Sequence, residues 1–356
     1  DYACFRARLS TMKHTFFPHP HLSTTRLGFS VILALALFGP LGLPGCSDNS
    51  AIVQDARVDG HEDLATRRDG LLADQNGHED ARGDLTGDHG KDDLSAPFTL
   101  RIMSANLTSG STQSYTPGHG ARIITAFHPD VVLIQEMNYG NKSPEDIATF
   151  VTRTLGPEYT YFRERGDIPN GIISRYPIIA SGEWDDIEVS NRDFAWAQID
   201  LPGPRDLWAV SIHFLTSQPG ERNREANALV AYLEAHVPAG SLLILGGDFN
   251  TKSRSEGCVD ALRKRLTIQK PYPADQANND NTNAKRNSPY DWLLASPTFH
   301  SLEVPLQIGS ASFPHGLVFD SRVYTPLADL PLVLKTDSDA SQMQHMAVIR
   351  QFQISP

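Results

Sequence analysis

Two polar residues that could do chemistry follow a short apolar run in the second half of the chain. Residues 242–250 read Leu-Leu-Ile-Leu-Gly-Gly-Asp-Phe-Asn, the pattern of a buried strand that ends at Asp248 and Asn250. Because side chains two residues apart on an extended chain point the same way, we expect both to face one site. Their oxygens suit a hard cation such as Mg²⁺, although Asp-x-Asn after two glycines is more often only a turn.

Three other apolar runs end in a similar way. Val-Val-Leu-Ile-Gln leads to Glu136, Leu-Trp-Ala-Val-Ser-Ile to His213, and Arg-Ile-Met-Ser-Ala to Asn106. Taken singly, such residues are more often a solvated strand end (Glu136), a satisfied core histidine (His213) and a turn former (Asn106). Since ligands of α/β proteins gather beyond the carboxyl ends of the strands, the four endings together indicate one active site.

These residues give the sequence a resemblance to the endonuclease/exonuclease/phosphatase superfamily. That group contains deoxyribonuclease I, abasic-site endonucleases, bacterial sphingomyelinases and inositol polyphosphate 5-phosphatases. The resemblance covers roughly residues 97–356 and implies an α/β fold, a four-layer α/β sandwich of two packed mixed β-sheets flanked by helices. Short motifs in the family's order carry it: Ser104-Ala105-Asn106, Gln135-Glu136, Asn170 to Ile178, Ser211-Ile212-His213, Gly247-Asp248-Phe249-Asn250, Tyr290 to Leu294, and His345.

The resemblance also implies a role for each strand-end residue. Glu136 resembles the principal Mg²⁺ ligand of the family, with Asn106 as a second ligand or orienting group. Asp248 resembles the residue that positions or deprotonates the attacking water, and Asn250 the residue that contacts the phosphate. A phosphodiester gains negative charge in its transition state, so a cation and a base for the water are what the reaction requires.

Two histidines complete the implied site. His345 resembles the C-terminal histidine of the family, and Asp291 the acid that fixes its tautomer. His213 resembles a second histidine that deoxyribonuclease I and the sphingomyelinases have and abasic endonucleases lack. A histidine works as an acid or base near neutral pH when a carboxylate sets its tautomer and charge. Asp291 is the expected partner of His345, and Glu164 is a candidate partner of His213.

One motif position departs from the family. The family usually has Ser-Asp-His near its C-terminus, whereas Gln344 precedes His345 here. A neutral amide contributes no anionic charge, although it can still form hydrogen bonds. The departure puts in doubt a second metal site and the basicity of the neighbouring histidine.

The sequence around these motifs is typical of an α/β enzyme. Residues 221–236 have apolar residues at helical spacing, and residues 144–155 predict a second helix with Ser143 as its N-cap. Residues 271–289 form a polar loop that leads into the Asp291 strand, and either a functional role or simple solvent exposure explains it. The candidates for phosphate contacts flank a motif strand or loop: Arg192, Arg254 and Arg286.

The N-terminal region predicts export. Residues 27–43 form an apolar run behind Lys13 and Arg26, and Leu-Pro-Gly-Cys46 resembles a bacterial lipobox, with Cys46 as the lipidated residue. We expect residues 1–46 to be a signal peptide, with residues 1–11 upstream of the natural start at Met12. Its 17 apolar residues and the Gly-Pro pair within them argue against an uncleaved span.

The next region, residues 47–96, is acidic and nearly free of aromatic residues. It cannot bury enough apolar surface to fold, so we expect a disordered acidic tether. Residues 97–356 are then one catalytic domain with a full core. Of the three cysteines, Cys4 precedes the signal, Cys46 would carry lipid and Cys258 stands alone, so no structural disulfide is expected.

The sequence therefore predicts a Mg²⁺-dependent phosphodiesterase, for which Mn²⁺ or Ca²⁺ would also serve. We expect a monomeric nuclease that acts on extracellular DNA or RNA from the bacterial cell envelope, either lipid-anchored through Cys46 or secreted. Of the net charge of −11, about −6 belongs to residues 97–356, so this domain lacks the basic footprint of a tight duplex binder. Two alternatives stay open: a sphingomyelinase or inositol-phosphate type of phosphoesterase, and a degraded enzyme that binds phosphate or nucleic acid at the surface. No cluster of adjacent aromatic residues of the kind that sphingomyelinases insert into bilayers is evident, which tilts the choice towards nucleic acid.

Overall fold

The structure is a computed structural model, and it describes residues 96–108 and 113–355. These residues belong to one compact unit of the chain, residues 83–356. The expected signal peptide, the lipidation site Cys46 and all but the last residue of the acidic tether lie outside the described residues. Among the helices that are described, none combines the length and apolarity needed to cross a membrane.

Two mixed β-sheets form the centre of this unit. The larger sheet contains, in spatial order, β10 (Glu303–Val304), β14 (Ala347–Ile354), β1 (Phe98–Ala105), β2 (Val131–Ile134), β4 (Gly171–Ser174) and β3 (Thr160–Arg163), with β13 (Leu317–Phe319) also paired to β14. The smaller sheet contains β5 (Ile178–Trp184), β6 (Phe194–Ile199), β7 (Leu207–His213), β8 (Leu242–Asp248) and β9 (Asp291–Ala295). A separate hairpin is made by β11 (Leu306–Ile308) and β12 (Ala311–Phe313).

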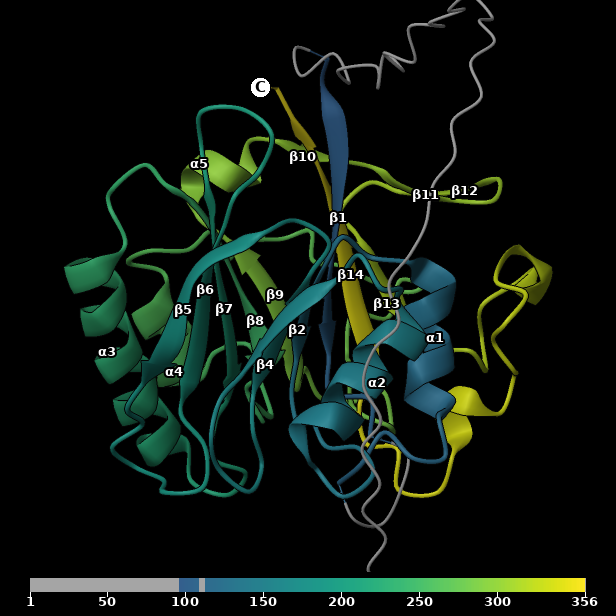
Figure 1. The fold of residues 1–356 in the computed structure, drawn as a ribbon, viewed down its shortest axis with the longest axis horizontal. Coiled ribbons are helices and arrows are strands. Elements are labelled where there is room, and N and C mark those ends of the chain that lie inside the picture. Colours follow the sequence, from purple (N-terminus) through teal and green to yellow (C-terminus); the bar gives the residue numbers. More distant parts are fainter. Residues whose placement is uncertain (1–95, 109–112, 356) are drawn as a thin grey trace, which may run out of the picture. The chain divides into compact units, whose positions relative to one another are not determined.

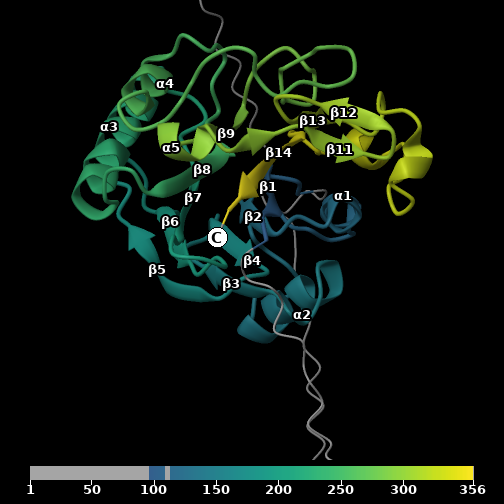
Figure 2. The same cartoon turned by 90° about the horizontal axis from the view of Figure 1, so that it is seen from above.

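Helices cover the outer face of each sheet (Figures 1 and 2). On the larger sheet these are α1 (His119–Phe127) and α2 (Pro144–Thr154), and on the smaller sheet α3 (Pro219–His236) and α4 (Gly257–Leu262). Short helical turns complete the fold: α5 (Pro297–His300), η1 (Leu327–Asp329) and η2 (Asp337–Asp339). The predicted four-layer α/β sandwich is confirmed.

Alternating side chains on the strands fill the interfaces between the layers. On β8, Leu242 and Ile244 belong to the core between the two sheets, whereas Leu243 and Leu245 pack under α3 and α4. The strands of the larger sheet alternate in the same way between the central core and the core under α1 and α2. Both faces of these strands are buried, which explains why their sequences are continuous apolar runs.

Both predicted helices are present. The oxygen of the Ser143 side chain caps α2 by accepting a hydrogen bond from the backbone N–H of Asp146 at 3.1 Å, and Pro144 occupies the first turn. The helix predicted over residues 221–236 begins slightly earlier, at Pro219, and ends at His236. It buries Ala226, Leu229 and Leu233 against the smaller sheet.

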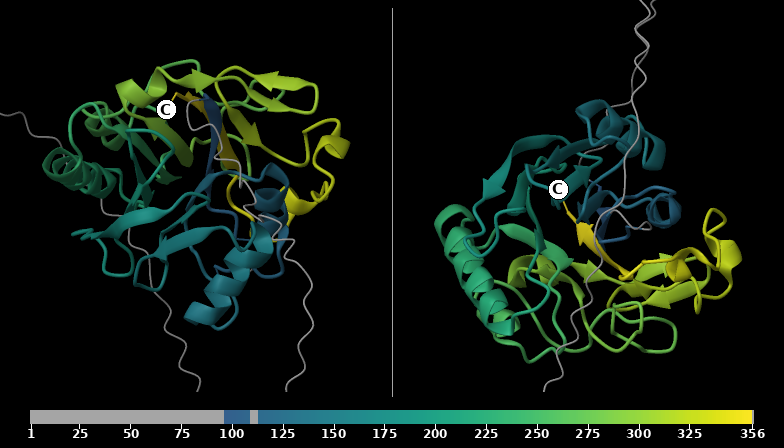
Figure 3. Two further views of the ribbon diagram at one scale, coloured as in Figure 1. Left: turned by 45° about the horizontal axis from the view of Figure 1, so that its top comes forward. Right: turned by 90° about the horizontal axis from the view of Figure 1, so that it is seen from below.

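Strand directions bring the residues predicted for catalysis and metal binding to one edge of the sandwich. β1 runs parallel to β2, and β7 runs parallel to β8, so these four strands end at that edge. β14 and β9 are antiparallel to their neighbours β1 and β8, so they begin there. In Figure 1 this is the lower edge, opposite the marked C-terminus, and the right-hand view of Figure 3 looks at it from below.

The close approach of β7 and β8 at this edge requires a glycine. Gly247 has φ +153°, and a Cβ atom at this position would lie 1.9 Å from the carbonyl oxygen of Ile212. Any side chain would therefore push apart the two strands that carry His213 and Asp248. The second glycine of the pair is what allows these two functional groups to be neighbours.

Candidate active site

Three neighbouring strands place three polar side chains in a row. His213 is the last residue of β7, Asp248 is the last of β8 and Asp291 is the first of β9. Their backbones are direct cross-strand partners, His213 with Asp248 and Asp248 with Asp291. Side chains at such positions lie close together on one face. Sheet register therefore assembles this part of the site.

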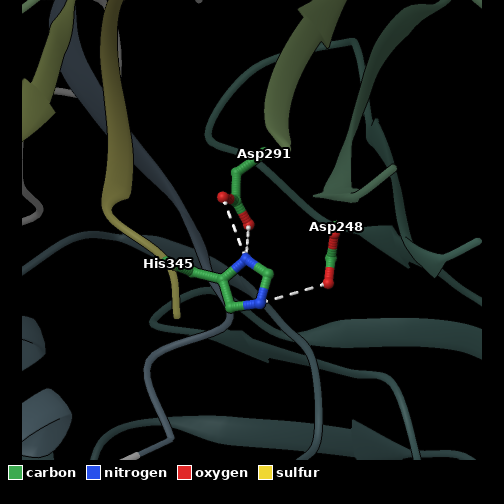
Figure 4. A group of neighbouring side chains, drawn as sticks. All are labelled: Asp248, Asp291 and His345. Atoms are coloured by element: carbon green, nitrogen blue, oxygen red, sulfur yellow. Dashed lines mark hydrogen bonds and ion pairs between the residues drawn. The ribbon is translucent and has the colours of Figure 1, made fainter. Parts of the chain in front are cut away.

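His345 lies between two carboxylates, as Figure 4 shows. Its Nδ1 is 3.1 Å from each carboxylate oxygen of Asp291, and its Nε2 is 3.4 Å from Oδ2 of Asp248. The hydrogen bond predicted between Asp291 and His345 is present. Asp291 is itself held in place, because its backbone N–H donates to the Thr282 hydroxyl at 2.6 Å.

Opposite charges on His345 and on its two neighbouring carboxylates shift one another's pKa values. Burial alone would lower the pKa of His345, but the carboxylates of Asp248 and Asp291 raise it to about 10, so the imidazole is protonated at neutral pH. Burial raises the pKa of Asp291 to about 6 against the opposing charge of His345. Burial would also raise the pKa of Asp248, but His345 and His213 hold it well below its usual range.

Both carboxylate oxygens of Asp248 have polar partners within the protein. Its Oδ2 lies 3.2 Å from Nε2 of His213 and accepts a hydrogen bond from Nδ2 of Asn106 at 3.1 Å. Its Oδ1 accepts one from the backbone N–H of Asn250 at 2.9 Å. With 1% of its surface exposed, Asp248 is a buried, ionised carboxylate that links both sheets.

Glu136 and Asn106 form the acidic part of the site that belongs to the larger sheet. The carboxylate of Glu136 has only long contacts, at 3.4 Å to Asn106 Nδ2 and at 3.4 Å to the Thr108 hydroxyl. The amide of Asn106 directs its Nδ2 at the carboxylates of Glu136 and Asp248, and its buried Oδ1 has no hydrogen-bond partner. An underused carboxylate beside an unpaired amide oxygen fits a hard divalent cation.

A second group also has the spacing of a metal site. One ligand atom from each of Asp248, Asp291 and His345 lies within 4.8 Å of the others. Both nitrogens of His345 already face carboxylates, however, and a metal ligand needs an unprotonated nitrogen. The geometry of these three residues therefore suits proton handling, and Glu136 with Asn106 are the residues that could hold a metal.

Two site residues have an unusual backbone conformation. Glu136 has φ +51° and Asn250 has φ +53°, both in the left-handed region that non-glycine residues rarely adopt. Each follows the end of its strand, so a turn, and not the alternation of an extended chain, directs these two side chains. Backbone strain of this kind often marks functional sites.

Tyr115 is a site-supporting residue that sequence reasoning missed. Its buried hydroxyl donates to the carbonyl oxygen of Ala105 at 2.6 Å and accepts from the N–H of Leu107 at 3.0 Å, so it holds both neighbours of Asn106. The same hydroxyl lies 3.2 Å from the carbonyl oxygen of Gln135, next to Glu136. No local sequence signal marks it.

A pair of polar side chains joins the two sheets behind the site. Gln135 donates to the Ser211 hydroxyl at 2.9 Å, and that hydroxyl donates to the carbonyl oxygen of Ile134 at 3.0 Å.

Asn170, which directly precedes β4, is another buried polar residue for which the sequence predicted no role in the site. Its Oδ1 has no hydrogen-bond partner.

The prediction that Arg192 contacts phosphate is wrong. Only 6% of its surface is exposed, and its guanidinium donates to the carbonyl oxygens of His213 at 2.5 Å and of Phe214 at 3.2 Å. The sequence placed it correctly beside a motif strand, but the distant backbone groups that it binds were not visible there.

The same prediction is wrong for Arg286, and Arg254 also has partners within the protein. Arg286 forms ion pairs with Asp275 at 2.8 Å and Asp320 at 2.9 Å, which fasten the 271–289 loop. Arg254 pairs with Asp280 at 3.2 Å, and its guanidinium stacks over the rings of Tyr272 and Trp292. Both guanidinium groups are used within the protein.

The 271–289 loop positions catalytic candidates. Its Asn283 forms a β-bridge with His345, and its Thr282 accepts hydrogen bonds from the backbone N–H groups of Asp291 and Met346. Solvent exposure alone does not account for this loop.

Glu164 is not the partner of His213. Its carboxylate accepts a hydrogen bond from the backbone N–H of Asn170 at 2.6 Å, and burial raises its pKa to about 9. The carboxylate beside His213 is Asp248, and Nδ1 of His213 is buried without a hydrogen-bond partner.

Gln344 is exposed, and among the described residues its side chain forms no hydrogen bond.

Comparison with known proteins agrees with this geometry. Residues 121–314 match the model of the Endonuclease/Exonuclease/phosphatase family, which is more than half of the chain. A search of curated proteins gave no match.

Solved structures that resemble this one have low sequence identity to it. An endonuclease/exonuclease/phosphatase from Bacteroides vulgatus aligns with a TM-score of 0.51 and 14% identity, over 73% of this chain and 100% of that one. A protein of the same description from Beutenbergia cavernae has a TM-score of 0.49 and 15% identity, over 72% of each chain. A humanized TDP2 from D. rerio has a TM-score of 0.47 and 16% identity, over 71% of this chain and 98% of that one.

Proposed function

Because this chain belongs to the endonuclease/exonuclease/phosphatase family, we propose that it is a divalent-metal-dependent phosphodiesterase, and that its substrate is nucleic acid. The observation that carries the proposal is the environment of Asp248. An ionised carboxylate at the sheet edge touches two imidazoles, His213 and His345, and the amide of Asn106, which belongs to the metal-binding pair. Hydrolysis of a phosphodiester needs a base, cationic donors and a metal site within one such space.

Each residue has a task that its geometry permits. Asp248 orients the attacking water and takes its proton as the oxygen bonds to phosphorus and the opposite P–O bond breaks. His345, kept protonated by Asp291, donates through Nε2 to a phosphate oxygen that gains charge. His213 is placed by its Nε2 contact with Asp248 to donate beside it.

The metal would be held by Glu136 and Asn106. We propose Mg²⁺, because a carboxylate and an amide oxygen are hard ligands, and Mn²⁺ or Ca²⁺ would accept the same atoms. A bound divalent cation neutralises charge on the scissile phosphate.

One described pair at the rim favours a nucleotide substrate. The ring of Tyr290 packs 5.6 Å from the ring of His345, and the ammonium group of the exposed Lys252 lies 4.0 Å from the Tyr290 ring centroid. An aromatic ring and a positive charge beside the reacting phosphate can contact the adjoining nucleotide.

A lipid phosphodiester is the second candidate substrate. Leu332 and Leu334 are 50% and 54% exposed on the segment between η1 and η2, with Lys335 beside them. Exposed aliphatic side chains next to a lysine suit the surface of a bilayer.

The test is hydrolysis of plasmid DNA, RNA and sphingomyelin by the purified full-length protein, with Mg²⁺ and with EDTA. We expect nicking of nucleic acid that EDTA abolishes. Cleavage of sphingomyelin alone would select the lipid candidate, and inactivity on all three substrates would favour a phosphate-binding surface protein.

We also propose that the protein is exported to a bacterial cell envelope and anchored through lipid on Cys46, and that it acts as a monomer. The lipobox-like Leu-Pro-Gly-Cys46 sequence supports the anchor. Mass spectrometry of the protein from a bacterial host should find a diacylated Cys46, and the Cys46→Ala protein should carry no lipid. An unmodified Cys46 in the wild-type protein would contradict the proposal.

A further inference from the structure

The backbone of the segment that follows β7 is held by buried ionisable side chains. Residues 213–216 leave the sheet at His213 and lead towards α3. Phe214 donates its N–H to the carbonyl oxygen of Asp248 at 2.9 Å, as expected beside a parallel strand. The contacts that follow come from side chains, and the three ionisable residues among them each have 6% or less of their surface exposed.

Arg192, on the connection between β5 and β6, holds the first two residues of the segment. Its Nε donates to the carbonyl oxygen of His213 and its Nη2 to that of Phe214. Its Nη1 donates to Asn191 at 3.2 Å, so the guanidinium is fixed in its own orientation. The planar fork of arginine can serve two adjacent carbonyls, which a lysine ammonium cannot do in the same geometry.

Two residues of α3 hold the rest of the segment. Both carboxylate oxygens of Glu225 lie 3.1 Å from the backbone N–H of Leu215, and Glu225 is fully buried. Arg222 donates to the carbonyl oxygen of Leu215 at 3.0 Å and to that of Thr216 at 3.3 Å. Its guanidinium is anchored by Glu256 at 2.6 Å.

Glu225 belongs to a buried carboxyl pair with Asp186. Burial and the neighbouring charge of Asp186 raise the pKa of Glu225 to about 8, and burial raises that of Asp186. Arg192 supplies a positive charge nearby. Burying two carboxyl groups and a guanidinium group together costs free energy. We therefore expect this cluster to have a role besides packing.

The held segment leads directly into the site. The Phe214 carbonyl that accepts from Arg192 also accepts from the side-chain amide of Asn250 at 3.0 Å. His213 has no partner on Nδ1, so its ring depends on its backbone and on the single contact with Asp248. Movement of this segment would therefore displace His213 and Asn250 together.

We propose that Arg192 and Glu225 are positioning residues, which set the imidazole of His213 and the amide of Asn250 for the reaction by holding the backbone of residues 213–216. The inference rests on the proposed phosphodiesterase function. A purely structural role would reduce the stability of the protein without acting through His213.

A double-mutant cycle distinguishes the two roles. We expect Arg192→Lys and Glu225→Gln each to lower kcat by about 10- to 100-fold with KM changed less than about 3-fold, since small displacements of catalytic groups have effects of this size. Added to His213→Ala, either substitution should lower kcat by a clearly smaller factor than it does in the wild-type protein, because one of the two groups that it positions is gone. Full additivity with His213→Ala would overturn the proposal.

Arg122→Lys is the matched control. Arg122 on α1 forms an ion pair with the fully buried Asp337, in the outer layer of the other sheet. The Arg122→Lys substitution should lower Tm by about as much as Arg192→Lys does, and it should leave kcat unchanged. Loss of kcat in proportion to Tm across all variants would indicate a structural role.

A measurement without turnover separates failure of this inference from failure of the proposed function. The ring resonances of His213, assigned by their absence in His213→Ala, should shift in Arg192→Lys and Glu225→Gln but not in Arg122→Lys. If they shift in a protein that hydrolyses nothing, the positioning role stands and the phosphodiesterase proposal fails. If they stay unchanged, the positioning proposal fails.

Discussion

The two histidines of the site are held in different ways. His345 has a carboxylate on each nitrogen, so side chains set its charge and tautomer. His213 touches one carboxylate, has no partner on Nδ1, and is held through the backbone of the segment that follows it. The difference indicates that His345 is specialised for carrying charge, and that His213 depends on correct placement next to Asp248.

The largest expected effect concerns the carboxylate behind His345. Asp291→Asn should lower kcat/KM nearly as much as His345→Ala, by roughly 10³-fold, because the histidine loses tautomer control and its favoured charged form. Steady-state kinetics on the preferred nucleic acid would measure this. Near-normal activity of Asp291→Asn would show that His345, like His213, is held by means other than its carboxylate.

Removal of the proposed metal ligand should have the next largest effect. Glu136→Gln should lower hydrolysis by at least about 10²-fold and weaken Mg²⁺ binding with the fold intact. Glu136 also contributes to the raised pKa of His345, so the substitution should lower the pKa of that histidine. The measurements are activity against Mg²⁺ concentration and NMR titration of His345. An unchanged Mg²⁺ dependence would refute the ligand assignment.

Glu164, which does not contact His213, should affect stability and not catalysis. Its pKa in the folded protein is raised to about 9 from 4.5, so its neutral form is favoured. The protonated Glu164 side chain therefore makes its whole contribution to the free energy of unfolding below about pH 4.5. This contribution is lost as the pH rises towards 9. Glu164→Gln should show a Tm advantage over wild type that is absent at pH 4.5 and grows to several degrees at pH 9.

The control for this prediction is Glu188→Gln, which removes a partly exposed carboxylate that pairs with Arg224. It should show no such gain at high pH. A loss of kcat in Glu164→Gln at constant Tm would instead restore Glu164 as a functional partner of His213.

The smallest effect is expected at Gln344. Gln344→Asp restores the residue that the family usually has, but the side chain is exposed, so solvent screens the added charge. We expect kcat/KM to change less than about 3-fold, and the pKa seen in the pH–rate profile to rise slightly. If activity appears only with Gln344→Asp, the wild-type protein is a binding protein and not an enzyme.

Local sequence was sufficient for the strands that carry the site. Apolar runs such as residues 242–245 are long and continuous because both faces are buried, and the polar residue that follows marks the strand end. The cap at Ser143 and the periodicity of α3 were equally visible, since helix signals act over a few residues. The pairing of Asp291 with His345 came from the family resemblance.

The partners of the buried arginines were not visible in the sequence. Arg192 and Arg286 lie beside motif segments, as predicted, but their guanidinium groups bind carbonyl and carboxylate oxygens far away along the chain. A buried arginine must satisfy its donors wherever acceptors lie in three dimensions, so its sequence neighbours do not predict its role.

Local interactions in the sequence thus account for the strands, the helices and the chemical types of the residues at their ends. The folded chain alone decides which of these residues meet. Sheet register aligns His213, Asp248 and Asp291, and left-handed turns direct Glu136 and Asn250. Contacts of this kind depend on segments that are distant in sequence and whose packing is cooperative, so no local pattern encodes them.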